Sequence, residues 1–253
     1  MARETEADTQ LSRAVRELWG MATGVRRGPK PAMSVRSIAA AGVALADADG
    51  IDAVTMAAVA KRLGFTTMSL YRYVESRQDL LAVMADEAFG PPPSLTRRRG
   101  WRGQVEEWAR ADARQLLAHP WIFDVRPGTP PVTPNLLAWM EVGFAAIAGS
   151  GLPLPQAASS LLTVDGYVRS NVQLARQFAD GGTGLWVSQL RLVLDPERLP
   201  TISAVMESGA FEDGGDDVTG DEFEFGLGLL LDGVEKLARG RHQELSPARR
   251  PRR

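Results

Sequence analysis

The stretch TMAAVAKRLGFTTMSLYRYV, residues 55–74, carries the clearest structural signal in this chain. Thr55 is a suitable N-cap for a helix whose apolar residues recur at helical spacing up to Leu63. Gly64 follows, in the position where a left-handed backbone commonly ends a helix. A second short helix, about residues 67–74, begins two or three residues later. A capped helix, a tight glycine turn and a short second helix are the layout of a helix-turn-helix, whose second helix enters the major groove of DNA.

Two further helices flank this pair. Residues 34–47 have Ser34 as a suitable N-cap and apolar residues at i, i+3 and i+4 spacing. A fourth helix is expected to start at Ser76, and the three prolines at 91–93 end it. We therefore predict a helix-turn-helix DNA-binding domain over residues 34–90.

The short second helix has two different faces. Leu70 and Val74 share one side, because residues four apart lie on the same face of a helix, and they would pack on the first two helices. The outward side is polar, basic and aromatic, with Met68, Ser69 and Arg72 flanked by Tyr71 and Tyr73. An ordinary three-helix module with surface tyrosines would show the same spacing, so the spacing leaves both interpretations open.

Several of these outward side chains suit DNA chemically. Arg72 can pair with guanine O6 and N7 or with a phosphate. Tyr71 and Tyr73 can donate a hydroxyl to phosphate and pack on sugar or a thymine methyl group. Thr67 and Ser69 can reach bases or backbone.

Helix N-termini and one arginine add candidate phosphate contacts. The N–H groups at Thr55-Met56 and at Thr66-Thr67 have no intrahelical partner and can bind phosphate. Arg77 lies in the first turn of the fourth helix, where a positive charge opposes the helix dipole, so it is better placed to reach a phosphate.

Charge is distributed unevenly along the chain. Although the net charge is −2, positive side chains outnumber negative ones by four between Arg26 and Arg77. A locally basic stretch suits phosphate contact, although a solvated charged face is its commoner meaning. We expect residues 1–33 to be a flexible basic leader whose Arg26, Arg27 and Lys30 form either an arm on the DNA or a solvated tail.

Four segments carry a family resemblance. They are Ala39–Gly50, Val59–Gly64, Leu70–Val74 and the pair Leu80-Leu81. Together, over about residues 33–89, they resemble the TetR family of repressors.

The resemblance implies roles for individual residues. The tyrosine of the family's Leu-Tyr pair contacts phosphate and maps to Tyr71, and a basic residue at the start of the fourth helix maps to Arg77. The family's base-reading positions map to Thr67, Met68, Ser69 and Tyr73. The family often has histidine or tryptophan where Arg72 and Tyr73 stand, so an operator sequence cannot be transferred.

The remainder of the chain also has helical periodicity and lacks the alternation typical of strands, so we expect an all-α fold. Helices are predicted over residues 101–118, 133–148, 155–179, 184–193, 196–208 and 220–239. We interpret residues 91–240 as a helical ligand-binding and dimerisation domain and 241–253 as a basic tail.

The segments Leu116–His119 and Arg126–Thr129 and the helix from Asn135 are similar to the tetracycline-repressor type of C-terminal domain. This resemblance implies a ligand pocket between the helices at 101–118, 133–148 and 155–179. The candidate lining residues are Trp108, Asp112, Arg126, Met140, Phe144, Tyr167 and Asn171. Each could instead be ordinary core. Arg126 stands near the place of a metal-binding histidine, which argues against a metal-bound drug as ligand.

Two helices carry stripes that suit a dimer interface. The candidate residues are Leu161, Val168 and Val172 on one helix and Phe223, Leu227, Leu230 and Val234 on the other. Leu229 and Leu231 make the second helix apolar most of the way round, so it must bury more than one face. The family places two such helices per subunit in a four-helix interface, whereas core packing within one subunit is the alternative.

Composition excludes several other functions. The chain has no cysteine and two histidines, which excludes disulfides and thiolate metal sites and disfavours a histidine-rich one. No apolar run approaches the roughly 20 residues that span a bilayer, and no signal-peptide pattern opens the chain, so we expect a cytoplasmic protein. We find no Gly-rich phosphate loop, nucleophile elbow or Ser-His-Asp set, and we expect no enzyme, cofactor or metal.

These observations predict a homodimeric, ligand-responsive transcriptional regulator, a repressor that a small molecule releases from double-stranded operator DNA. Two alternatives stay open. One is a helical enzyme fused to a DNA-binding head, and the other is a DNA-binding protein regulated by a protein partner rather than by a ligand.

Overall fold

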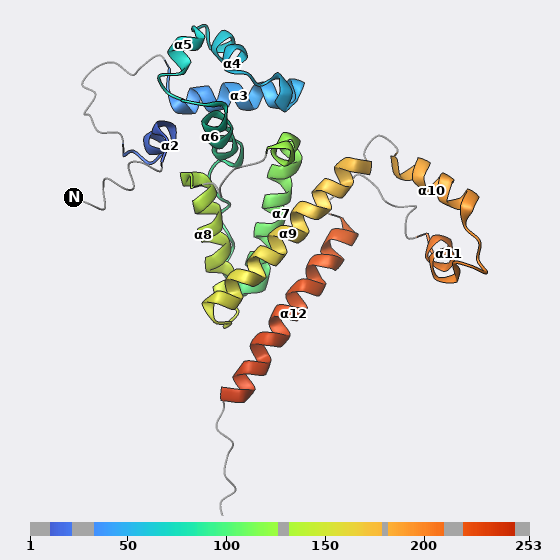
Figure 1. The fold of residues 1–253 in the computed structure, drawn as a ribbon. Helices are drawn as coiled ribbons and strands as arrows, with labels where there is room; N and C mark the ends of the chain where they lie inside the picture. Colours follow the sequence, from blue (N-terminus) through green and yellow to red (C-terminus); the bar gives the residue numbers. More distant parts are fainter. Residues whose placement is uncertain (1–10, 22–32, 126–131, 179–181, 210–219, 246–253) are drawn as a thin grey trace, which may run out of the picture. The chain divides into compact units, whose positions relative to one another are not determined.

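The computed structural model describes residues 11–21, 33–125, 132–178, 182–209 and 220–245. Within these ranges every regular element is helical, as expected for an all-α fold (Figure 1). The chain divides into two compact units, residues 1–149 and 150–253.

The first unit contains seven α-helices among its described residues. They are α2 (Arg13–Leu18), α3 (Val35–Asp49), α4 (Met56–Leu63), α5 (Thr67–Leu70), α6 (Arg77–Phe89), α7 (Gly100–Ala118) and α8 (Pro134–Ala148). Three 3-10 turns lie between them: η1 (Ile51–Ala53), η2 (Arg97–Arg99) and η3 (Pro120–Asp124). The first unit therefore holds the whole predicted helix-turn-helix and the first two helices of the predicted sensor domain.

Local sequence explains where α3 begins and ends. The Ser34 hydroxyl accepts from the backbone N–H of Ser37 at 3.1 Å, and the Ser37 side chain accepts from the Ser34 N–H, which completes a capping box. The helix ends at Gly50, whose φ of 81° suits glycine. It runs two residues beyond the predicted end.

The core of the first unit forms where α3 packs against α6. Ile38, Val59 and Leu80 are fully buried in one cluster of apolar side chains. A glycine permits this close approach, because a Cβ on Gly42 would lie 2.6 Å from the sulfur of Met84.

The helix α2 was not expected, because it lies inside the segment predicted to be a flexible leader. Ser12 caps it by accepting from the Val15 N–H at 3.3 Å. Ala14 and Val15 are buried, and α2 contacts both α3 and α6. The prediction of a flexible leader is therefore wrong for residues 11–21. A helix of six residues is unstable on its own, and packing against α3 and α6 stabilises this one.

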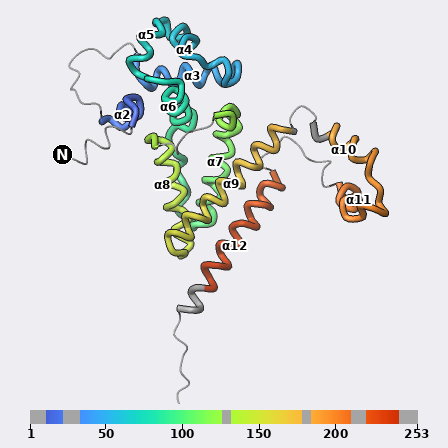
Figure 2. The backbone as a smooth tube through the Cα atoms, in the orientation of Figure 1, coloured from blue at the N-terminus to red at the C-terminus, as the bar shows by residue number. Residues whose placement is uncertain are grey.

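The second unit contains α9 (Leu154–Phe178), α10 (Gly182–Val193), α11 (Pro200–Glu207) and α12 (Asp221–Leu245). The two long helices, α9 and α12, pack along each other (Figure 2). The ring of Tyr167 lies 5.6 Å from that of Phe223, and its hydroxyl donates to the Phe223 carbonyl at 3.0 Å. Gly226 accommodates the tyrosine, since a Cβ there would lie 2.6 Å from the ring atom Cζ.

None of the helices that the structure describes combines the length and apolar character needed to cross a membrane.

Candidate DNA-binding interface

The helix-turn-helix is formed by α4 and α5. The Thr55 hydroxyl accepts from the Ala58 N–H at 3.1 Å and caps α4. At its other end Gly64 is left-handed, with φ 75° and ψ 25°. The Phe65 N–H donates to the Ala60 carbonyl at 2.9 Å, and the Gly64 N–H to Lys61 at 3.1 Å. This pair of bonds is a Schellman motif, which reverses the chain within two residues and leads directly into α5.

The recognition helix α5 turns the expected side outward. Leu70 and Val74 are fully buried and anchor it on the core. Met68 is 75% exposed, Tyr71 is 44% exposed, and Arg72 is also exposed. Three of the five side chains predicted to face outward, Met68, Tyr71 and Arg72, are therefore exposed, whereas Ser69 and Tyr73 are half-buried.

The other predicted base-reading residues are partly covered. Thr67, Ser69 and Tyr73 are half-buried. The Thr66 hydroxyl caps α5, accepting from the Ser69 N–H at 3.3 Å. This cap fixes the position of the helix through the N–H of Ser69, which is not one of the N–H groups at Thr66-Thr67 that are predicted to bind phosphate.

At the start of α4, Thr55 is exposed whereas the side chain of Met56 is buried. The Met56 side chain therefore faces the core, and only its backbone could take part in the predicted phosphate contact.

Arg77 lies at the first position of α6 and is exposed. Its Nη2 donates to the Ile51 carbonyl of η1 at 3.3 Å. This bond uses one of the five N–H donors of the guanidinium group, so donors remain for a phosphate. The bond also steadies the side chain beside the helix-turn-helix.

Arg26, Arg27 and Lys30 of the predicted arm, and Arg126 of the predicted pocket, lie outside the described residues.

Two carboxylates join the predicted DNA-binding domain, residues 34–90, to the rest of the first unit, and sequence reasoning missed both. Asp47, near the end of α3, has one oxygen 2.8 Å from Nδ1 of His119 and 2.7 Å from Nε1 of Trp121. The indole N–H donates to this oxygen. This bond between Trp121 and Asp47 connects η3 to α3, and no local pattern in the sequence indicates it.

The second carboxylate, Asp86 on α6, is only 1% exposed. Its Oδ1 accepts from the backbone N–H groups of Asn135 at 2.7 Å and Leu136 at 3.4 Å. In return the Asn135 side chain donates to the Asp86 carbonyl at 3.0 Å. Asp86 therefore caps the N-terminus of α8 across the helix contact, where a negative charge is favourable.

The predicted ligand-binding residues are divided between the two units. In the first unit, Trp108 and Asp112 are buried, Phe144 is half-buried and Met140 is exposed. The Trp108 N–H donates to the Trp139 carbonyl at 3.0 Å, which gives this side chain a structural bond.

Tyr167 and Asn171 belong to the second unit and are half-buried. Burial raises the pKa of the Tyr167 hydroxyl, opposed by a hydrogen bond with Asn171 that lowers it. Ligand binding by the set of predicted residues stays a prediction.

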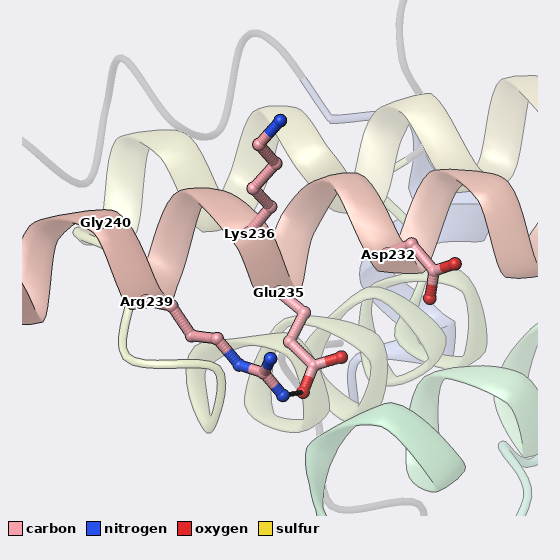
Figure 3. Close-up of a pocket in the computed structure, with 5 residues that line it drawn as sticks. All are labelled: Asp232, Glu235, Lys236, Arg239 and Gly240. Atoms are coloured by element: carbon pink, nitrogen blue, oxygen red, sulfur yellow. Dashed lines mark hydrogen bonds and ion pairs between the residues drawn. The ribbon is translucent and has the colours of Figure 1, made fainter.

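A surface hollow lies on α12, and none of the predicted ligand residues lines it (Figure 3). Its lining residues are Asp232, Glu235, Lys236, Arg239 and Gly240. All five come from one helix and are mostly exposed, and Arg239 pairs with Glu235 at 2.6 Å. A charged, open hollow of this kind lacks the apolar enclosure typical of small-molecule sites. The described part of the chain contains no group of side chains suited to hold a metal ion.

The predicted dimer residues are mostly covered within one chain. Those buried are Leu161, Val168 and Val172 on α9 and Phe223, Leu227 and Val234 on α12, and Leu230 is half-buried. Another apolar set on α12 is exposed instead, with Phe225 at 71%, Leu229 at 59% and Leu237 at 62%. As expected, α12 is apolar on more than one face, and these three side chains remain exposed in the single chain.

Comparison with known proteins relates this architecture to a family. Residues 38–84 match the bacterial regulatory proteins of the tetR family, and residues 92–238 match the tetracyclin repressor-like C-terminal domain. Seven residues, 85–91, separate the two matches, which together cover most of the chain.

Individual relatives support the same family assignment. The HTH-type transcriptional repressor DrrR1 of Streptomyces coeruleorubidus is 34% identical, over 96% of this chain and 93% of its own. The tetracycline repressor protein class A from transposon 1721 of Escherichia coli is 25% identical, over 74% of this chain and 83% of its own. The crystal structure of apo ActR from Streptomyces coelicolor has the same fold, with a TM-score of 0.72 at 23% identity over 84% of this chain and 99% of ActR.

Proposed function

Because the chain belongs to the TetR family of bacterial regulatory proteins, we propose that it is a repressor that binds operator DNA and is released from it by a small molecule. The observation that carries the proposal is the exposed face of α5, with Tyr71 and Arg72 outward and Leu70 and Val74 anchored beneath. No catalytic step, cofactor or metal enters the proposal, and the protein acts in the cytoplasm.

The contacts with DNA divide into two groups. Tyr71 and Arg77 bind phosphates and set the position of the protein, together with the helix N-termini at Thr55-Met56 and Thr66-Thr67 and an arm containing Arg26, Arg27 and Lys30. Sequence is read in the major groove by Thr67, Met68, Ser69 and Tyr73, with Arg72 on guanine or on phosphate.

We propose that the protein works as a homodimer. One helix-turn-helix reads only a half-site, and a two-fold pair doubles the phosphate contacts. Phe225, Leu229 and Leu237 support this proposal, because they leave an apolar stripe of α12 exposed in a single chain. Such a stripe is stabilised when a second copy covers it.

Release by ligand requires a path from the sensor helices to α6. Asp86 supplies one, since its bonds make α6 and the N-terminus of α8 a single packed element. A ligand that moves α8 would therefore move α6 and the recognition helix of each subunit. Ligand and operator then weaken each other reciprocally, typically by about 1–3 kcal/mol.

The proposal is tested by incubating the full-length protein with a library of random-sequence DNA duplexes. Sequencing the duplexes that the protein retains identifies the operator. We expect a two-fold symmetric consensus with half-sites about one helical turn apart, or a small multiple of it. If the protein binds no duplex more tightly than a scrambled duplex of the same length, the proposal of sequence-specific DNA recognition is contradicted.

Two variants then separate the contact groups. Arg77→Ala should weaken binding to selected and scrambled duplexes alike and reduce the slope of log K against log salt by about one per lost phosphate contact. Thr67→Ala should change the sequence preference and leave that slope unaltered. Equal losses on every duplex for both variants would contradict the assignment of Thr67 as a base reader.

A further inference from the structure

The short helix α2 bridges two parts of the first unit. It has six residues, too few to be stable alone, and is fixed by the Ser12 cap and by the burial of Ala14 and Val15 against the core. Its polar side chains are therefore held in defined positions relative to α3 and α6.

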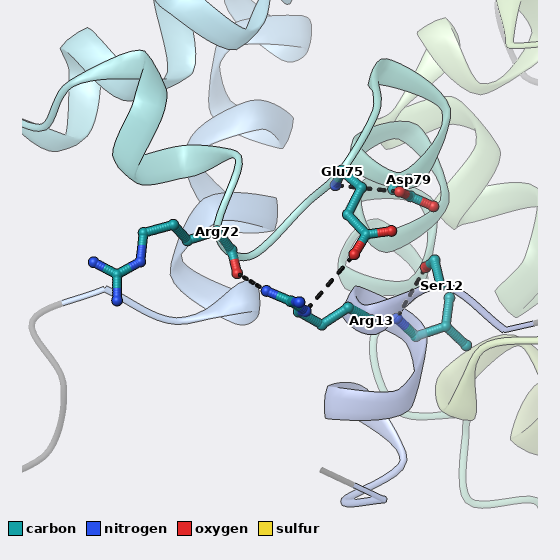
Figure 4. Close-up of polar contacts among 6 residues, drawn as sticks. Ser12, Arg13, Arg72, Glu75 and Asp79 are labelled. Atoms are coloured by element: carbon teal, nitrogen blue, oxygen red, sulfur yellow. Dashed lines mark hydrogen bonds and ion pairs between the residues drawn. The ribbon is translucent and has the colours of Figure 1, made fainter. Parts of the chain in front are cut away.

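At its start, α2 contacts the end of the recognition helix. Nη1 of Arg13 donates to the carbonyl of Arg72 at 3.1 Å, and its Nε lies 3.7 Å from a carboxylate oxygen of Glu75 (Figure 4). Arg72 lies in the turn that directly follows α5. Carbonyls at the C-terminal end of a helix lack an intrahelical donor, and a cationic side chain is a favourable partner there. The exposed ion pair with Glu75 adds little, so the bond to the carbonyl is the important contact.

At its other end, α2 is tied to the segment that leads into α8. The indole N–H of Trp19 donates to the Val132 carbonyl at 2.7 Å. Glu17 accepts from the N–H of Val35, the first residue of α3, at 3.5 Å. The helix thus spans from the recognition helix to the approach of α8.

We infer that α2 is a positioning element for operator binding and that Arg13 is its positioning residue. The inference rests on the proposed function. Arg13 holds the backbone of Arg72, while the Arg72 side chain points away from it (Figure 4) and stays available to DNA. Arg13 therefore acts through the recognition helix rather than on the DNA.

The recognition helix needs such support because α5 has only four residues. Thr66 fixes its N-terminal end, and Leu70 and Val74 fix its buried side. Arg13 fixes the remaining end, from which Tyr71 and Arg72 project.

The test measures binding of the full-length protein to the duplex selected by the wild type and to a scrambled duplex, across a range of salt concentrations. Arg13→Ala should weaken binding to the selected duplex roughly tenfold, the value of one charge-assisted hydrogen bond. The slope of log K against log salt should not change, because no phosphate contact is lost. Arg13→Lys should restore most of the affinity, since an ammonium group can also donate to the Arg72 carbonyl.

Arg239→Ala is the matched control for loss of one positive charge, and it should leave binding unchanged. Hydrogen exchange without DNA supplies a second measurement, in which Arg13→Ala should speed exchange at residues 71–76 and Arg13→Lys should not. The inference is overturned if Arg13→Ala binds like the wild type, or if it lowers the salt slope by about one, which indicates a direct phosphate contact. These outcomes differ from failure of the proposed function, in which the wild type itself selects no duplex.

Discussion

Replacing Asp86 should reveal how strongly α6 is joined to α8. In Asp86→Ala the N–H of Asn135 loses its 2.7 Å acceptor in a site where the carboxylate is only 1% exposed. A buried donor left without a partner costs about 1–3 kcal/mol, and loss of an N-cap costs about 0.5–2 kcal/mol. The 3.4 Å bond from Leu136 is long and contributes little. Because these costs overlap, we expect a loss of about 2–4 kcal/mol in the free energy of unfolding.

Urea unfolding followed by circular dichroism at a fixed protein concentration measures this loss. Asp86→Asn keeps an oxygen acceptor but loses the charge at the helix N-terminus, so it should cost less than alanine, up to about 2 kcal/mol. Glu87→Gln, the neighbouring carboxylate on the same helix, is the matched control and should lie within about 0.5 kcal/mol of the wild type. An Asp86→Ala protein as stable as this control would refute the view that Asp86 caps α8.

Two further changes test the second unit. Gly226→Ala places a methyl group against the ring of Tyr167 and should destabilise the protein by about 1–3 kcal/mol, whereas Gly228→Ala, where a Cβ meets nothing within 4 Å, should be neutral or stabilising in the same unfolding assay. Equal effects of the two would contradict the close packing of α9 on α12. Leu229→Glu should shift the mass measured by light scattering from dimer towards monomer, because it places a charge in the apolar stripe of α12. Met68→Glu, an equally drastic change at an exposed residue of α5, should leave the mass at that of a dimer, and an unshifted mass for Leu229→Glu would exclude this stripe as the interface.

Local chemistry made the helix-turn-helix predictable. Ser34, Thr55 and Gly64 each do what their residue type favours at a helix end, with no help from distant parts of the chain. The orientation of α5 follows from the burial of Leu70 and Val74, because four-residue spacing alone places them on one face. For these features the sequence and the structure carry the same information.

Long-range contacts were not predictable in this way. Asp47 bonds to residues more than 70 positions along the chain, and α2 is stable only because α3 and α6 are there to cover it. A hydrophobic stripe in a sequence also does not show whether the same chain or a partner chain buries it. Phe223 and Leu227 fit the pattern of a dimer seam, yet a single chain already buries them, and Leu229 is one of the residues left outside.

If the protein pairs through the apolar stripe exposed on α12, as proposed, pairing also contributes to its stability in the cell. An isolated copy would present Phe225, Leu229 and Leu237 to water, so pairing and folding share one equilibrium and the melting temperature should rise with protein concentration. Newly made chains that have not yet met a partner would then be the form most open to proteolysis and aggregation. The cellular level of repressor would then depend on how fast chains find one another as well as on how fast they are made.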